Sequence, residues 1–207
     1  FICISYELPS TDVNNIVETL FKRYHFPKIE GKVGKYESDY NELCHFIRSL
    51  YEDRKMTIRQ LEQYMLYLRI AIENMLGLSF STTTIALMTL LKLHDSEFFE
   101  KYLTYKVDDN EFIRYIENHF GIGLLNGHTP ISMQYFYPSV ADMMKIRYTP
   151  DEREDALRNE DGTLKFQTTK LDPEQFPRCF TNIDLSMPGL DVIREKLDLL
   201  SSINLNL

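Results

Sequence analysis

The 207-residue sequence has no tryptophan and only three cysteines, Cys3, Cys44 and Cys179. The cysteines are far apart and odd in number, which argues against a disulfide framework and against a zinc site built from paired cysteines. We therefore expect free, buried thiols in a reducing cytoplasm. Long hydrophobic runs are missing too. The apolar run at residues 85–93 is too short to span a bilayer, so no membrane span is expected.

Several catalytic signatures are also absent. No Gly-x-x-x-x-Gly-Lys-[Ser/Thr] motif occurs, because the paired glycines at 31/34 and 121/123 lack the Lys-Ser or Lys-Thr that would follow. No Gly-x-Ser-x-Gly elbow and no His-Glu-x-x-His motif is present. Positive charge is scarce, with a net charge of −8 and a pI near 5.2, which argues against a broad nucleic-acid-binding face.

Helical periodicity dominates what is present. Apolar residues recur at spacings of three and four over most of the chain, which predicts helices with one buried face. Ser81 and Asp95 are expected to cap two of them, and Pro27 and Gly77 to follow two others. Helices are predicted at about residues 13–25, 37–54, 57–76, 85–93, 96–103, 108–120, 133–146 and 190–200. In the second, the inward residues are predicted to be Tyr40, Leu43, Cys44, Ile47 and Leu50.

The first nine residues differ from the rest. Residues 1–9 read Phe-Ile-Cys-Ile-Ser-Tyr-Glu-Leu-Pro, an apolar-rich run that predicts a strand. A single strand cannot satisfy its own backbone groups, so its partners are expected outside the chain. The predicted fold class is therefore mostly α, a helical bundle preceded by one strand that belongs to an α/β core elsewhere, and we expect the chain to be a fragment.

One helix carries a residue for which we expect a function. Residues 57–62 read Thr-Ile-Arg-Gln-Leu-Glu and open a helix of about 18–20 residues. Its predicted buried face comprises Ile58, Leu61, Met65, Leu68 and Ile72. Arg59 lies one step off this face, so the packed residues beneath it are expected to fix the direction of its guanidinium. The structural alternative is an ordinary ion pair with Glu62 or Glu73.

Three stretches resemble landmarks of the KAP family of P-loop NTPases, in the same order and spacing. Residues 1–9 resemble its last core strand followed by Leu-Pro, and residues 56–62 resemble its lid helix with an arginine, an apolar residue and Glu. Residues 86–101 resemble its apolar helix ending in Leu-Lys, followed by Asp and an aromatic-Glu-Lys turn. The resemblance covers about residues 1–105 and fades beyond them.

The resemblance implies a nucleotide-dependent function. Residues 1–9 would end the NTPase core, residues 10–107 would form a helical lid, and residues 108–207 would form a C-terminal helical extension. Arg59 would be the lid arginine, contacting the γ-phosphate of ATP. ATP and Mg²⁺ would be bound mainly outside this chain, which lacks the P-loop and is not expected to hydrolyse ATP alone. The implied output is coupling to a protein partner, or self-association, in signalling or phage defence.

The second hypothesis is a non-enzymatic helical domain that binds other proteins, with Arg59 only an ion-pair member. Other polar groups favour structural roles, and no catalytic residue or metal ligand is predicted. The acidic runs at 108–109 and 151–155 are typical of helix starts. Residues 135–138, Tyr-Phe-Tyr-Pro, favour a core position, with a partner-binding surface as the alternative. None of the histidines has metal-ligating spacing: His25, His45, His94, His119 and His128.

Overall fold

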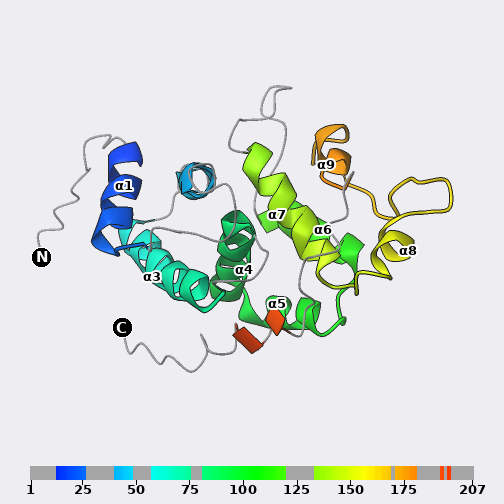
Figure 1. The fold of residues 1–207 in the computed structure, drawn as a ribbon, viewed down its shortest axis with the longest axis horizontal. Helices are drawn as coiled ribbons and strands as arrows, with labels where there is room; N and C mark the ends of the chain where they lie inside the picture. The colour runs from blue at the N-terminus through cyan, green and yellow to red at the C-terminus, as the bar shows by residue number, and fades with distance from the viewer. Residues whose placement is uncertain are drawn as a thin grey trace, which may run out of the picture.

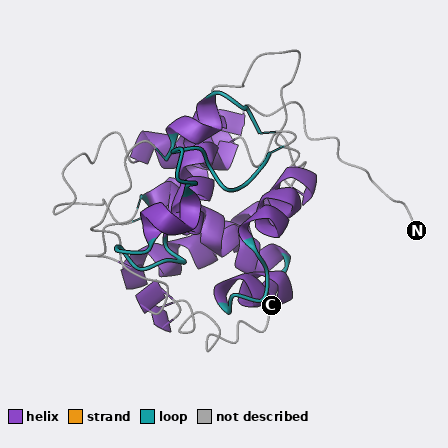
Figure 2. Ribbon diagram, turned by 90° about the vertical axis from the view of Figure 1, so that its right-hand side faces the viewer, coloured by secondary structure: helices purple, strands orange, loops and turns teal. Residues whose placement is uncertain are grey.

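The computed structural model describes residues 13–26, 40–48, 57–75, 81–119, 133–168, 171–180, 192–193 and 195–196. This part of the chain is mostly helical and contains no sheet (Figure 2). Its one β pairing is an isolated antiparallel bridge between Arg158 and Leu164. The prediction of a mostly helical fold is therefore confirmed. The strand predicted at residues 1–9 lies outside the described residues and stays a prediction.

The helices follow the predicted segments closely (Figure 1). They are α1 (Val13–Arg23), α3 (Ile58–Met75), α4 (Thr82–His94), α5 (Ser96–Leu103), α6 (Asp109–His119), α7 (Met133–Lys145), α8 (Arg153–Leu157) and α9 (Gln175–Arg178). Residues 40–48 are helical as well, and so are the few described residues near 190–200. The two short helices α8 and α9 were not predicted, because four or five residues are too few to show a helical period.

Helix α4 lies at the centre of the packing, in contact with α3, α5 and α7 (Figure 1). Ser81 caps it as predicted, its hydroxyl accepting a hydrogen bond from Thr84 N at 3.1 Å. Nearly all of its residues are buried: Thr82, Thr83, Thr84, Ile85, Ala86, Leu87, Met88, Thr89, Leu90 and Leu91. A helix that is apolar on most sides has to be covered on most sides, and three neighbouring helices cover this one.

A single hydrophobic cluster runs through the described chain from Val17 to Ile193. Aromatic contacts join its parts. Phe46 stacks on Phe136 of α7 with ring centroids 5.5 Å apart, and Tyr102 of α5 stacks on Phe112 of α6 at 4.0 Å. The cluster thus includes residues on both sides of the boundary predicted at 107/108, and that boundary stays a prediction.

One inward assignment is wrong. Leu43, Cys44 and Ile47 are buried as expected, but Tyr40 is 39% exposed. Tyr40 lies at the boundary of the cluster, where its ring and the Phe21 ring form a T-shaped pair with centroids 5.1 Å apart. A tyrosine fits such a boundary because its hydroxyl keeps contact with water while its ring packs. Leu50 and the helix end expected at Gly77 lie outside the described residues.

Two helices end in left-handed residues that are not glycine. His25 follows α1 with φ 44°, and Phe26 N donates to Phe21 O at 3.3 Å. Tyr105 follows α5 with φ 58°, and Lys106 N donates to Lys101 O at 2.9 Å. Both geometries satisfy carbonyls that a helix end leaves unpaired. They also fix where the Tyr105 side chain lies, which matters for a pocket considered below.

Candidate functional site

Arg59 lies in the first turn of α3, and a reciprocal cap defines where that helix starts. Gln60 N donates to Thr57 Oγ1 at 3.3 Å, and Thr57 N donates to Gln60 Oε1 at 3.0 Å. This is the capping-box arrangement, in which two backbone donors of the first turn are satisfied by side chains. The cap therefore fixes the backbone on both sides of Arg59.

The helix beneath Arg59 buries the predicted face. Its buried residues are Leu61, Tyr64, Met65, Leu68, Ala71, Ile72 and Met75. Ile58 is only partly buried, because it lies at the start of the helix, while Arg59 is exposed. The predicted orientation of the helix is thus confirmed, and Arg59 projects from the side that does not pack.

The two acidic residues considered as partners of Arg59 are bound by other arginines. Glu62 Oε1 lies 2.6 Å from Arg23 Nη1 of α1, and Glu73 Oε1 lies 3.0 Å from Arg69 Nε one turn earlier in α3. Arg59 itself makes no hydrogen bond or ion pair with any described residue. The ion-pair alternative for Arg59 is therefore not found in this part of the chain.

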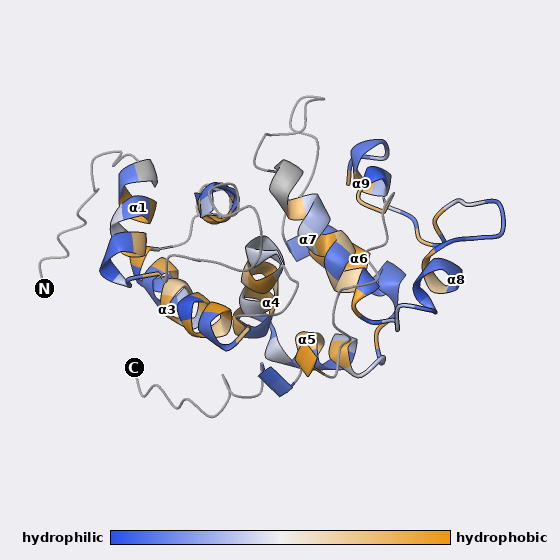
Figure 3. Cartoon of the chain, in the orientation of Figure 1, coloured by the Kyte–Doolittle hydropathy of each residue, from blue (hydrophilic) through white to orange (hydrophobic). Residues whose placement is uncertain are grey.

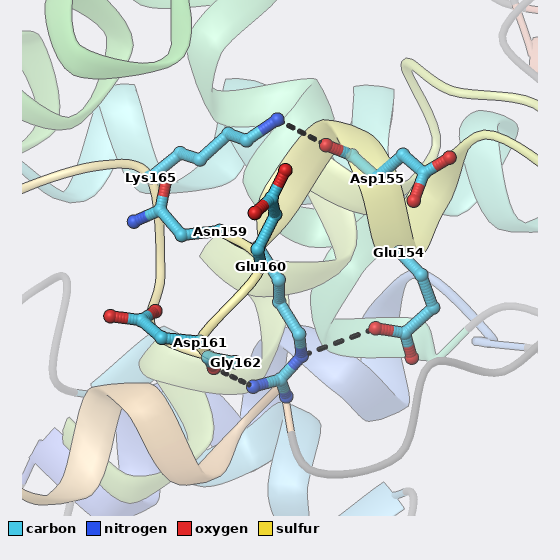
Figure 4. Close-up of a pocket in the computed structure, with 8 residues that line it drawn as sticks. Glu154, Asp155, Asn159, Glu160, Asp161, Gly162 and Lys165 are labelled. Carbon is cyan, nitrogen blue, oxygen red and sulfur yellow. Dashed lines mark hydrogen bonds and ion pairs between the residues drawn. The ribbon is translucent and has the colours of Figure 1, made fainter.

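Two pockets lie far from Arg59 in the chain, near α8. The first has a volume of about 930 Å³ and is shown in Figure 4. Its lining is polar: Glu154, Asp155, Arg158, Asn159, Glu160, Asp161, Gly162 and Lys165. Much of that polarity is already satisfied. Arg158 Nε pairs with Glu154 at 3.3 Å and its Nη1 donates to Gly162 O at 2.8 Å, while Lys165 donates to the Asp155 carbonyl.

The wall of this pocket is a tight turn. A turn is formed at Asp161-Gly162, with Gly162 at φ +81° and Asp161 Oδ1 accepting from Thr163 N at 2.9 Å. Hydrogen bonds from Thr163 lower the pKa of Asp161. Hydrophilic residues dominate α8 and this loop (Figure 3). Local folding therefore accounts for most of the polar groups that line this pocket.

The second pocket, of about 640 Å³, borders a buried ion pair. Arg147 is 5% exposed and places Nη1 2.7 Å from Asp109 Oδ1, while Tyr148 donates its hydroxyl to Asp109 Oδ2 at 2.8 Å. The Arg147 guanidinium also lies 4.5 Å from the ring centroid of Tyr102 and 5.1 Å from that of Tyr105. Burial, and then the charge of Asp109, raise the pKa of Tyr148, so this phenol stays neutral at physiological pH.

The sequence treated Asp108 and Asp109 alike, and the structure separates them. Asp108 Oδ1 accepts from Glu111 N at 2.8 Å, which is the expected role of an acidic residue at a helix start. Asp109 instead neutralises Arg147, a residue 38 positions away. No local pattern could have signalled that pair, because Arg147 lies in the turn after α7, far away in the sequence.

Arg153 departs further from expectation. It belongs to the acidic run at 151–155 but is fully buried, and its Nε donates to Lys145 O at 3.0 Å and to Tyr148 O at 3.2 Å. Lys145 is the last residue of α7 and Tyr148 lies in the turn that follows it, where helix carbonyls lose their regular partners; the Lys145 carbonyl also accepts from Tyr148 N at 3.2 Å. Arg153 thus caps α7 from inside, and the acidic neighbours are left on the surface.

The cysteines and histidines divide into isolated groups and one pair. Cys44 is buried and Cys179 is half-buried, and both are free thiols. Burial raises the pKa of Cys44, and it raises the pKa of Cys179 to about 11, so both thiols are protonated at neutral pH.

His94 and His119, treated separately in the sequence, lie together with ring centroids 5.9 Å apart. Of residues 135–138, Phe136 and Tyr137 are buried, as the core assignment requires. Cys3 and His128 lie outside the described residues.

In the described part of the chain, no three or more His, Cys, Asp and Glu side chains converge as a metal-binding group. None of the helices in that part has the length and apolarity needed to cross a bilayer. Comparisons with protein-family models, with curated proteins and with solved structures found no match to this chain.

Proposed function

We propose that this chain is the C-terminal part of a KAP-type P-loop ATPase, with its helical lid at residues 10–107 and a helical extension at 108–207, and that Arg59 contacts the γ-phosphate of bound ATP. The observation that carries the proposal is the state of Arg59: exposed in the first turn of α3, while the nearby Glu62 and Glu73 pair with other arginines. Three resembling stretches of sequence, in the family's order, add support.

The chemistry suits that role. A guanidinium presents several donors in a planar fork that matches phosphate oxygens, and it remains charged at any physiological pH. The buried face of α3 holds the Arg59 backbone in place, and the exposed side chain extends from the side of the helix that does not pack. A lid that closes over a nucleotide would thereby bring one positive charge to the γ-phosphate, where negative charge is redistributed during transfer.

The remaining parts of the site are proposed to lie outside this chain. ATP and Mg²⁺ would be held there by a P-loop and an acidic strand, and Arg59 would report whether the γ-phosphate is present. Movement of the lid would pass that state to a protein partner, or to a second copy of the protein, in a cytoplasmic signalling or phage-defence system.

The test uses the intact protein that carries this chain, with Arg59→Ala, Arg59→Lys and a matched control. Arg114 is a suitable control, because it is an exposed arginine in α6 with no hydrogen bond or ion pair to a described residue. We expect Arg59→Ala to slow ATP hydrolysis strongly, by less than the factor of about 10³–10⁵ known for arginine fingers. Lysine should restore little, and melting temperatures should match wild type.

Unchanged turnover in Arg59→Ala would contradict the lid proposal. The second hypothesis, a helical protein-interaction domain without enzymatic function, would then be the better one. A loss of activity in Arg114→Ala as large as in Arg59→Ala would also contradict the proposal.

A further inference from the structure

The rings of His94 and His119 meet where two helices end. His94 is the last residue of α4 and His119 the last residue of α6, and their ring centroids are 5.9 Å apart with the planes at 66°. Both residues are exposed. The two positions are 25 residues apart in the sequence and on different helices, so no local motif marks the pair.

The orientation of His119 is set by its own helix. Its Nδ1 lies 3.1 Å from the carbonyl oxygen of Tyr115, and because a carbonyl oxygen only accepts hydrogen bonds, Nδ1 carries the proton in the neutral ring. Nε2 then holds the lone pair. Metal-binding histidines commonly have this arrangement, in which a backbone carbonyl fixes the nitrogen that does not bind the metal.

A stack of aromatic rings supports His119 from one side. Tyr115 lies against the His119 ring with centroids 4.0 Å apart and planes at 20°, and Phe98 stacks on Tyr115 at 3.6 Å and 11°. The Tyr115 hydroxyl lies 3.4 Å from Asp95 Oδ2, which places a carboxylate beside the same stack. A carboxylate and the negative ends of two helix dipoles all favour a cation at this position.

The separation of the rings suits a shared ion. With a Zn–N bond of about 2.1 Å and a nitrogen about 1.1 Å from the ring centre, two imidazoles on one tetrahedral zinc ion have centroids about 5.2 Å apart. The observed 5.9 Å exceeds this by a margin that a small rotation of the exposed His94 ring closes, while His119 stays on the Tyr115 carbonyl. We propose that His94 and His119 bind one divalent transition-metal ion of the zinc class. Water fills the remaining positions.

The site would connect the ends of α4 and α6. An ion bound to both histidines would hold the two helix ends together, and binding to the folded chain would raise its stability with the logarithm of the metal concentration above the dissociation constant. This inference does not depend on the proposed ATPase function, and its test involves no nucleotide.

The experiment titrates Zn²⁺ alone into the untagged 207-residue chain, followed by calorimetry and by melting with and without metal. We expect one equivalent to bind and the melting temperature to rise. Loss of a supporting hydrogen bond at a metal site typically weakens binding about 10–100-fold, so His94→Gln and His119→Gln should each weaken it at least about tenfold. Both should melt like wild type when EDTA is present, because neither side chain is buried.

His25→Asn is the matched control. His25 is an exposed histidine elsewhere, and asparagine tolerates its left-handed backbone at φ 44°. It should bind Zn²⁺ as wild type does. Binding that both Gln variants retain unchanged, or that His25→Asn loses equally, would overturn the proposal, as would the absence of saturable binding. If a Gln variant melted at a lower temperature than wild type in EDTA, the absorption spectrum of Co²⁺ bound to the wild-type chain would be used instead. A tetrahedral Co²⁺ spectrum would support the proposal, and its absence would overturn it.

Discussion

Two regions of this molecule are buried in different ways. The α3–α4 pair fills its interior with apolar side chains, and α4 is covered by α3, α5 and α7. The junction from the end of α7 to α8 buries charged residues as well: Lys145 and Arg147 are each 5% exposed, and Arg153 is fully buried. The comparison teaches that one region is stabilised by apolar area, and the other by hydrogen bonds and ion pairs to its buried charges, with Arg147 Nε the one of these atoms that has no partner among the described residues.

The pairing at the junction is specific. Lys145 Nζ donates to Cys179 O at 2.8 Å and lies 3.5 Å from Asp142 Oδ1, while Arg153 binds two carbonyls at the end of α7. Buried charges are tolerated when each has partners of this kind, and removing one partner leaves a charge in a medium that solvates it poorly. The junction should therefore be more sensitive to loss of a partner than the α3–α4 pair is to loss of a methyl group.

The largest effect is expected from Asp109→Ala. The change leaves the Arg147 guanidinium buried without its carboxylate and removes the acceptor of the Tyr148 hydroxyl. Breaking a buried pair from one side costs about 3–5 kcal/mol, to be measured by urea unfolding. Asp108→Ala is the control, since it removes only a helix cap worth about 1 kcal/mol. Equal losses of stability in the two variants would mean that breaking the buried ion pair costs no more than removing a helix cap.

A smaller but still large effect is expected from Leu68→Ala in the apolar region. Leu68 is fully buried, so its truncation removes apolar contacts and leaves a cavity, at a cost of about 2–5 kcal/mol. Leu93→Ala is the control, because Leu93 is 39% exposed and should change stability by about 0.5 kcal/mol or less. A Leu68→Ala loss as small as that of Leu93→Ala would show that the core repacks around the gap.

The same contrast explains what the sequence could and could not predict. The periodic spacing of Leu61, Met65 and Leu68 predicts a helix and its buried face, and both are found. The burial of an arginine is harder to predict, because the sequence alone favours a surface position for every charged side chain. Arg59 is exposed as expected, yet Arg147 and Arg153 are buried by contacts that join different elements. Such contacts leave no local pattern, and the meeting of His94 and His119 was missed for the same reason.

The candidate site was predictable to the same extent. Arg59 was expected on the flank of its helix, off the buried face, and it is exposed there. The ion pair between Glu62 and Arg23 could not be predicted from the sequence, because Arg23 comes from a different helix, α1. Whether Arg59 meets a phosphate depends on groups outside the described residues, so its role stays a prediction that the hydrolysis experiment addresses.

The smallest effect is expected where the two regions meet, at the start of α4. Ser81 accepts from Thr84 N at 3.1 Å, and the Thr84 hydroxyl in turn donates to Asp142 Oδ2 of α7 at 3.0 Å. Ser81→Ala removes the cap while keeping the apolar face, so it should cost about 1 kcal/mol, within the range of about 0.5–2 measured for such caps.

For a chain of this length, 1 kcal/mol lowers the melting temperature by about 2–4 °C, which thermal unfolding detects. Ser96→Ala is the matched control, because Ser96 is an exposed first residue of α5 whose cap is Asp95 instead. It should melt within about 0.5 kcal/mol of wild type. A Ser81→Ala loss near that of Asp109→Ala would mean that the cap, through Thr84 and Asp142, belongs to the same paired network as the junction.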